Sequence, residues 1–134
     1  MSPSDSKRKL VYVVEDDEEQ LTLLRMVLHS AGFDVVTETG ADRVLTGVRS
    51  LRPDVVLLDV MLPSREGLDG FQLCQQLRSD PELGRIPVLI VSAIAEGVGD
   101  LRDKVRTQVG ADDFFVKPYD PSALVKRIRE LTGA

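Results

Sequence analysis

A short, wholly apolar run that ends in one carboxylate constrains this chain more than any other feature. Residues 55–58 carry no polar side chain, Pro53 and Asp54 precede them, and Asp59 ends the run. Four consecutive β-branched or leucine residues are typical of a strand buried on both faces, as in a parallel sheet covered by helices. Asp59 is then expected at the carboxyl end of a central strand, where the ligand crevices of open α/β sheets lie. Taken alone, the run leaves a helix-capping role for Asp59 equally open.

Short apolar runs alternate with amphipathic segments along the whole chain. This pattern predicts five strands, at Leu10 to Val14, Phe33 to Val36, Val55 to Asp59, Val88 to Ser92 and Asp113 to Val116. Helices are expected between and after the strands, with apolar stripes at Leu21, Leu24, Leu28 and Ala31; Val44, Val48 and Leu51; Phe71, Cys74 and Leu77; Leu101, Val105 and Val109; and Leu124, Ile128 and Leu131.

Capping residues set the ends of the first and last helices. Asp17 is expected as the N-cap of the first helix, and Gly32 as the residue that stops it. Asp120 caps the last helix, with Pro121 at its first position. In the fourth helix, about 100–109, the apolar residues alternate with the basic residues Arg102, Lys104 and Arg106, so we expect it to be the least firmly anchored.

Five β–α units in series predict a single α/β domain with a flavodoxin-like, three-layer architecture. Successive parallel strands need crossover helices, and those crossovers are right-handed. We therefore expect a five-stranded parallel sheet of order 2-1-3-4-5 with five helices. Residues 1–8 are polar and without periodicity, which predicts a flexible leader before a domain at 9–134.

Composition narrows the classes of function. The net charge of −5 argues mildly against non-specific binding to nucleic acid. Cys74 is the only cysteine, so no internal disulfide can form, and its place on a helix face predicts a small buried side chain. No apolar stretch approaches the roughly 20 residues of a membrane span, and no signal-peptide core is present. We expect a cytoplasmic protein with no membrane contact.

The predicted strand ends gather an unusual set of polar side chains. Glu15, Asp16 and Asp17 follow the first strand, Asp59 ends the third, Ser92 ends the fourth, and Lys117 follows the fifth. Clustered carboxylates repel, and a hard cation such as Mg²⁺ relieves this with oxygen ligands. A lysine adds a point charge suited to a phosphoryl group, towards which Asp59 can act as a nucleophile. Each residue alone has an ordinary structural role available, but their coincidence at matching strand ends favours a phosphoryl-transfer site.

At these residues the sequence resembles the receiver domain of two-component response regulators, from Lys9 to about Leu131. The resemblance rests on the first strand end and on the segments 54–63, 87–93 and 110–118. It implies that Asp59 is the phosphoacceptor and that a histidine kinase or histidine phosphotransfer protein is the donor. It further implies Mg²⁺ bound by Asp16, Asp59 and the Met61 backbone carbonyl, with Glu15 acting through water and Asp17 serving as the helix cap.

The resemblance also assigns a switch. Ser92 is expected to bond the phosphoryl group, and Phe114 is expected to turn inward. His29, on the first helix, is expected to be a surface or boundary residue and not the donor. Apolar Met61 and Ile94, two residues past Asp59 and Ser92, predict slow self-dephosphorylation. A cis peptide is expected at Lys117–Pro118.

The predicted output is contact with a downstream protein, or with a second copy of the chain through the fourth helix, fifth strand and fifth helix. The basic residues there either dock such partners or form solvated helix faces: Arg102, Lys104, Arg106, Lys126, Arg127 and Arg129. Segments 63–71 and 93–110 are longer than the family pattern, and we expect them to alter partner docking or the lifetime of the phosphoryl group.

Several readings stay open beside a stand-alone signalling switch that is not a turnover enzyme. The chain could be the receiver portion of a longer regulator with a DNA-binding or enzymatic output domain, or a docking module that never accepts phosphate. A phosphatase with an aspartyl nucleophile is disfavoured, because Val60 and Met61 leave out the second acid of the Asp-x-Asp pattern. Flavin binding is disfavoured too, since no Gly/Ser/Thr-rich phosphate loop follows the first strand.

Overall fold

A parallel sheet forms the centre of the molecule in the computed structural model, which describes residues 8–59, 70–92 and 110–134. Its five strands lie in the order β2-β1-β3-β4-β5, so the predicted topology is confirmed. The strands are β1 (Leu10–Val14), β2 (Asp34–Glu38), β3 (Val55–Asp59), β4 (Val88–Ser92) and β5 (Asp113–Val116).

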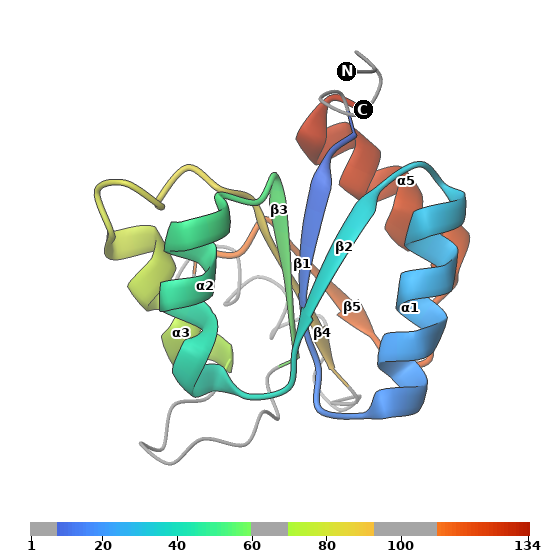
Figure 1. Ribbon diagram of the computed structural model, residues 1–134, viewed down its shortest axis with the longest axis horizontal. Coiled ribbons are helices and arrows are strands. Elements are labelled where there is room, and N and C mark those ends of the chain that lie inside the picture. Colours follow the sequence, from blue (N-terminus) through green and yellow to red (C-terminus); the bar gives the residue numbers. More distant parts are fainter. Residues whose placement is uncertain (1–7, 60–69, 93–109) are drawn as a thin grey trace.

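Helices cover both faces of the sheet (Figure 1). Helices α1 (Glu18–Ser30) and α5 (Pro121–Thr132) lie on one face, and α2 (Val44–Leu51) and α3 (Gly70–Ser79) lie on the other. A single 3₁₀ turn, Ala41–Arg43, leads into α2. The fourth predicted helix lies outside the described residues. Among those residues, no helix is long and apolar enough to cross a bilayer.

The predicted caps are confirmed at α1 and α5. The Asp17 carboxylate accepts the backbone N–H of Glu19 at 2.9 Å, and Gly32 follows α1 with a φ of 97°. The Asp120 carboxylate accepts the N–H of Ser122 at 2.9 Å, directly before Pro121 in the first turn. These short-range contacts start α1 and α5 just past the carboxyl edge of the sheet.

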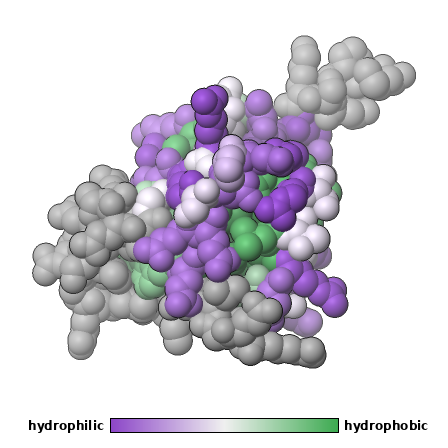
Figure 2. All heavy atoms as spheres, turned by 90° about the vertical axis from the view of Figure 1, so that its left-hand side faces the viewer, coloured by the Kyte–Doolittle hydropathy of each residue, from purple (hydrophilic) through white to green (hydrophobic). Residues whose placement is uncertain are grey.

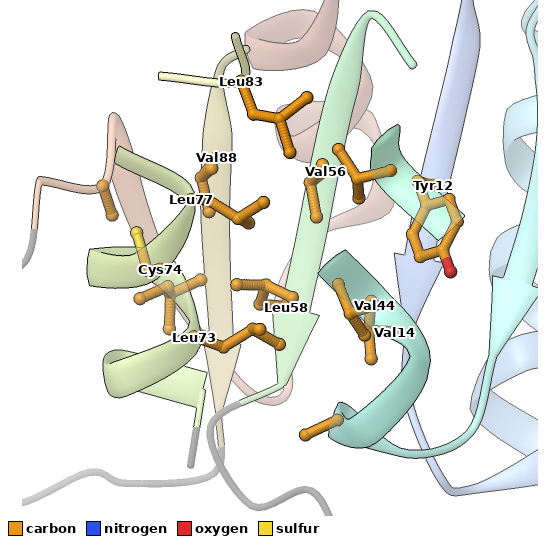
Figure 3. Close-up of a cluster of buried hydrophobic side chains, with 14 of the residues drawn as sticks. Tyr12, Val14, Val44, Val56, Leu58, Leu73, Cys74, Leu77, Leu83 and Val88 are labelled. Carbon is orange, nitrogen blue, oxygen red and sulfur yellow. The ribbon is translucent and has the colours of Figure 1, made fainter. Parts of the chain in front are cut away.

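The core consists of two clusters, one on each face of the sheet. All five residues of β3 are buried, as expected for a strand covered on both faces. Figure 3 shows Leu73 and Leu77 of α3 pointing towards Leu58 and Val56 of β3. Cys74 is buried in the same cluster, so the prediction that it is a buried small side chain is confirmed.

The second strand and second helix differ in part from prediction. The strand begins at Asp34 and continues to Glu38, because the backbone N–H of Phe33 bonds the Leu28 carbonyl in the last turn of α1 at 3.0 Å. The Phe33 ring lies in the core with residues of α1 and α5. Leu51, expected on the apolar stripe of α2, is 45% exposed. It is the last helical residue before Arg52, which adopts a left-handed conformation with a φ of 50°.

Candidate functional site

The carboxyl edge of the sheet brings four of the predicted site residues together. Glu15 and Asp16 directly follow β1, Asp59 ends the neighbouring strand β3, and Lys117 directly follows β5. Since all five strands are parallel, their carboxyl ends meet at one edge. Residues separated by up to 102 positions, such as Glu15 and Lys117, are in direct contact there.

Three carboxylates form a compact acidic cluster at this edge. One oxygen each from Glu15, Asp16 and Asp59 lies within 4.8 Å of the others. Glu15 and Asp59 are buried, with 1% and 4% of their surface exposed, while Asp16 is exposed. Buried acids beside one solvent-facing acid give a set of oxygen donors that is open to solvent on one side. This donor chemistry fits a hard divalent cation such as Mg²⁺.

Lys117 connects two members of the cluster. Its Nζ donates a hydrogen bond to Asp59 Oδ2 at 2.9 Å and another to Glu15 Oε1. Burial opposes the charge on Lys117, but the hydrogen bonds to Glu15 and Asp59 prevail and raise its pKa. The ammonium is thereby held charged beside Asp59. The predicted cis peptide at Lys117–Pro118 is confirmed.

Burial dominates the electrostatics of Glu15. It raises the pKa of the Glu15 carboxyl to about 7; the hydrogen bond from Lys117 acts against this, and the neighbouring Asp59 adds to it. The other carboxylate oxygen of Glu15 accepts the backbone N–H of Asp16 at 3.1 Å. The structure therefore has Glu15 ion-paired to Lys117, a contact the sequence did not predict.

The remaining predicted residues divide into three groups. Phe114 of β5 is fully buried in the core beneath α2 and α3. Ser92 ends β4 and pairs with Val116 in the sheet, but its side chain, like Met61 and Ile94, lies outside the described part of the structure. His29 is exposed near the far end of α1, with Nδ1 3.4 Å from the Arg8 guanidinium.

A second charged cluster, at the amino edge of the sheet, was not predicted. The Arg78 guanidinium pairs with Asp112 and also donates to the backbone carbonyls of Gly110, Gly84 and Ile86 at 2.6–2.9 Å. The Asp112 carboxylate accepts the N–H of Val88 at 2.8 Å as well. The sequence pattern around Arg78 carries no signal for this network, because an arginine in the last turn of a helix is normally solvated.

Comparisons with known proteins agree on one family. The family model for the response regulator receiver domain matches residues 11–129. The DNA-binding response regulator MtrA of Mycolicibacterium smegmatis is 38% identical over 125 residues, which are 93% of this chain and 51% of MtrA. The chain spans about half the length of the curated relatives it matches.

Solved structures agree with that match. The BeF3-activated N-terminal receiver domain of Klebsiella pneumoniae RstA is 30% identical, with a TM-score of 0.79 over 93% of this chain and 99% of that one. The receiver domain of the sensor histidine kinase PA1611 of Pseudomonas aeruginosa, which has a magnesium ion coordinated in its active-site cleft, gives a TM-score of 0.80. The match covers 95% of this chain and 99% of that domain. At 24% sequence identity, this structural likeness shows a shared fold alone.

Proposed function

Since the chain belongs to the response regulator receiver domain family, we propose that Asp59 is its phosphoacceptor. The proposed donor is a phosphohistidine on a histidine kinase or histidine phosphotransfer protein. The observation that carries the proposal is the Lys117 Nζ, 2.9 Å from Asp59 Oδ2 and bonded to Glu15, beside the three clustered carboxylates. A nucleophilic carboxylate, an adjacent cation and an acidic cluster are the parts that phosphoryl transfer to aspartate needs.

The proposed reaction is a displacement at phosphorus. A carboxylate oxygen of Asp59 forms the new P–O bond while the P–N bond to the donor imidazole breaks. The electron pair of that bond stays with the imidazole nitrogen, which leaves. Lys117, which already binds Asp59, neutralises negative charge on the transferred oxygens, and Glu15 positions Lys117 through their ion pair.

Magnesium is the proposed cofactor. Asp16 and Asp59 would hold it directly and Glu15 through water, with the Met61 carbonyl as a further ligand from outside the described residues. When bound, Mg²⁺ would offset the negative charge of the carboxylates and of the incoming phosphoryl oxygens. Support comes from the oxygen donors of Glu15, Asp16 and Asp59, which lie within 4.8 Å of one another.

We propose that the signal passes through Ser92 and Phe114. Support comes from the position of Phe114, which lies on the strand next to β4 and is fully buried in the core. Ser92 would then be the residue that bonds the phosphoryl group and carries its arrival to the segment after β4.

A longer regulator is the second candidate for the whole protein. The MtrA relatives are named as DNA-binding proteins and are about twice as long as this chain, so the expectation of output through protein contacts without nucleic acid gains no support from them.

Family membership supports the cytoplasmic location that we proposed from the sequence.

Chemical phosphorylation tests the assignment of Asp59. The protein is incubated with Mg²⁺ and acetyl phosphate, and intact mass spectrometry should show one acid-stable, base-labile phosphoryl group. Asp59→Asn should remove the adduct, whereas Asp34→Asn, at an exposed carboxylate near the opposite edge of the sheet, should leave it unchanged. An equal adduct on Asp59→Asn would refute the assignment, and no adduct on the wild type would favour the docking module.

A further inference from the structure

The described residues contain two sulfur side chains, Met26 and Cys74, and the fold places them in opposite surroundings. Met26 lies on α1 with 63% of its surface exposed, on the wall of a groove of about 880 Å³ between α1 and α5. Cys74 lies on α3 with 0% exposed. The other methionines of the chain, Met1 and Met61, lie outside the described residues. The two described sulfurs therefore differ almost completely in their access to solvent.

The surroundings of Cys74 protect its thiol from oxidants. The side chain lies in the core cluster between the sheet and helices α2 and α3 (Figure 3), and the outer surface of those helices is largely hydrophilic (Figure 2). Burial raises the pKa of the Cys74 thiol to about 11; Arg78 acts against this rise and Asp112 adds to it. Oxidants react with the thiolate, which is scarce at neutral pH for such a group. The only cysteine of the chain is therefore inert in the folded protein.

Met26 has the opposite chemistry. A thioether has no proton to lose, so the reaction of its sulfur with a peroxide depends on access to solvent. The sulfur lone pair attacks one oxygen of hydrogen peroxide, and the O–O bond breaks with its electron pair on the other oxygen. The proton of the transferred oxygen moves to that leaving oxygen, which departs as water. The sulfur is oxidised to the sulfoxide, and the peroxide is reduced to water.

The position of Met26 allows the fold to tolerate this change. A sulfoxide disrupts a core because it buries a polar oxygen, but Met26 belongs to neither core cluster. The new oxygen accepts hydrogen bonds, which water and the Ser30 hydroxyl can donate, since Ser30 lies one turn further along α1 on the same groove. Oxidation of Met26 therefore makes the exposed face of α1 more polar without removing a core contact.

We propose that Met26 is a modification site, which peroxides oxidise reversibly to methionine sulfoxide in the folded protein while Cys74 stays reduced. Methionine sulfoxide reductases return the thioether, so the exposed face of α1 can change from apolar to polar and back. The proposal does not involve Asp59. Its test is made on unphosphorylated protein, where failure of the phosphoacceptor assignment has no effect on the result.

Hydrogen peroxide treatment of the full chain, followed by peptide mass spectrometry, tests the proposal. Met26 should gain one oxygen at a rate within about threefold of that of free methionine in the same tube, because most of its side chain is in solvent. The two sulfoxide reductases, one for each epimer, should remove that oxygen. Cys74 should stay reduced, and it should react with a thiol reagent at least about a hundredfold more slowly in the folded protein than in urea.

Thermal unfolding by circular dichroism tests whether the fold tolerates the sulfoxide. Oxidation should shift the midpoint by less than about 2 °C relative to Met26→Leu treated in the same way. Met26→Leu keeps the volume of the side chain and lacks the sulfur, so the comparison cancels any effect of oxidation at Met1 and Met61. Loss of the unfolding transition in the oxidised wild type alone would overturn the proposal.

Two further variants, made in the Met26→Leu background, separate exposure from position in the sequence. Leu23 and Leu24 are neighbours on α1 with 49% and 3% of their surface exposed, and Leu→Met conserves volume at either position. Leu23→Met should restore oxidation on α1, whereas Leu24→Met should be oxidised at least about tenfold more slowly. Equal rates in these two variants, oxidation of Cys74 ahead of Met26, a Met26 rate below the stated range, or no reversal by the reductases would each overturn the proposal.

Discussion

Each edge of the sheet carries a cluster of ion pairs and hydrogen bonds, but the two clusters differ in their balance of charge. At the amino edge, the Arg78 guanidinium bonds Asp112 and three backbone carbonyls, so one positive charge faces one negative charge with its donors satisfied. At the carboxyl edge, the Lys117 ammonium bonds two of the three clustered carboxylates. The Arg78–Asp112 pair is therefore balanced in charge, whereas the cluster at the carboxyl edge has three carboxylates and one ammonium.

This difference explains why one cluster supports the fold and the other is suited to chemistry. A balanced, hydrogen-bonded network gains nothing from a further ligand, and removing one member leaves an unpaired charge. A cluster with excess negative charge is held in place by the fold at a cost in stability, and a cation relieves that cost. The excess of negative charge in a largely buried cluster is therefore the feature that distinguishes the carboxyl edge.

The largest effect is expected at the balanced edge. Arg78→Ala should lower the free energy of unfolding by about 3–4 kcal/mol, because it leaves the Asp112 carboxylate without its cation and removes the donor shared by three backbone carbonyls. Arg85→Ala, at an exposed arginine on the loop before β4, should change it by less than about 0.5 kcal/mol. Urea unfolding measures both, and a loss under about 1 kcal/mol for Arg78→Ala would contradict the role given to this network.

The second largest effect is expected at the carboxyl edge, in the pH dependence of stability. The pKa of Glu15 is raised to about 7, mainly by burial, so the folded protein holds its proton more tightly than the unfolded chain does. Without metal, stability should therefore fall as pH rises from about 4.5 to 7, by up to roughly 3 kcal/mol at 1.36 kcal/mol per pKa unit. Glu15→Gln should remove this decline. Urea unfolding in chelator-treated buffer measures the pH profile of both proteins. An unchanged profile in Glu15→Gln would assign the decline to other groups.

Magnesium should give the smallest of the three effects. At a concentration 100 times its dissociation constant, it should stabilise the wild type by about 2.7 kcal/mol, because it binds the folded acidic cluster. Asp59→Asn should reduce the gain, whereas Arg78→Ala should retain it in full, since Arg78 lies at the other edge. Thermal unfolding with and without Mg²⁺ measures each gain. Equal losses in both variants would mean that the two edges are not independent.

Local patterns in the sequence predicted most of the fold. Four of the five strands have the expected bounds, and the caps Asp17 and Asp120 lie where they were expected, because these features depend on neighbours a few residues away. Phe33 was misassigned to a strand because an apolar aromatic is equally suited to a strand and to a buried turn. The Arg78 network was missed, since its carbonyl partners have no side-chain signature.

The sequence by itself determined the order of the strands, the residue types at their carboxyl ends and therefore the membership of the acidic cluster. Only the tertiary structure decided how those groups share charge: that Glu15 pairs directly with Lys117, and that burial brings the pKa of Glu15 near neutrality. It also decided that Leu23 and Met26 stay exposed beside α5. The physical reason is that residue order and spacing specify strands and their ends, whereas burial and pairing of a side chain depend on groups brought close from distant parts of the chain.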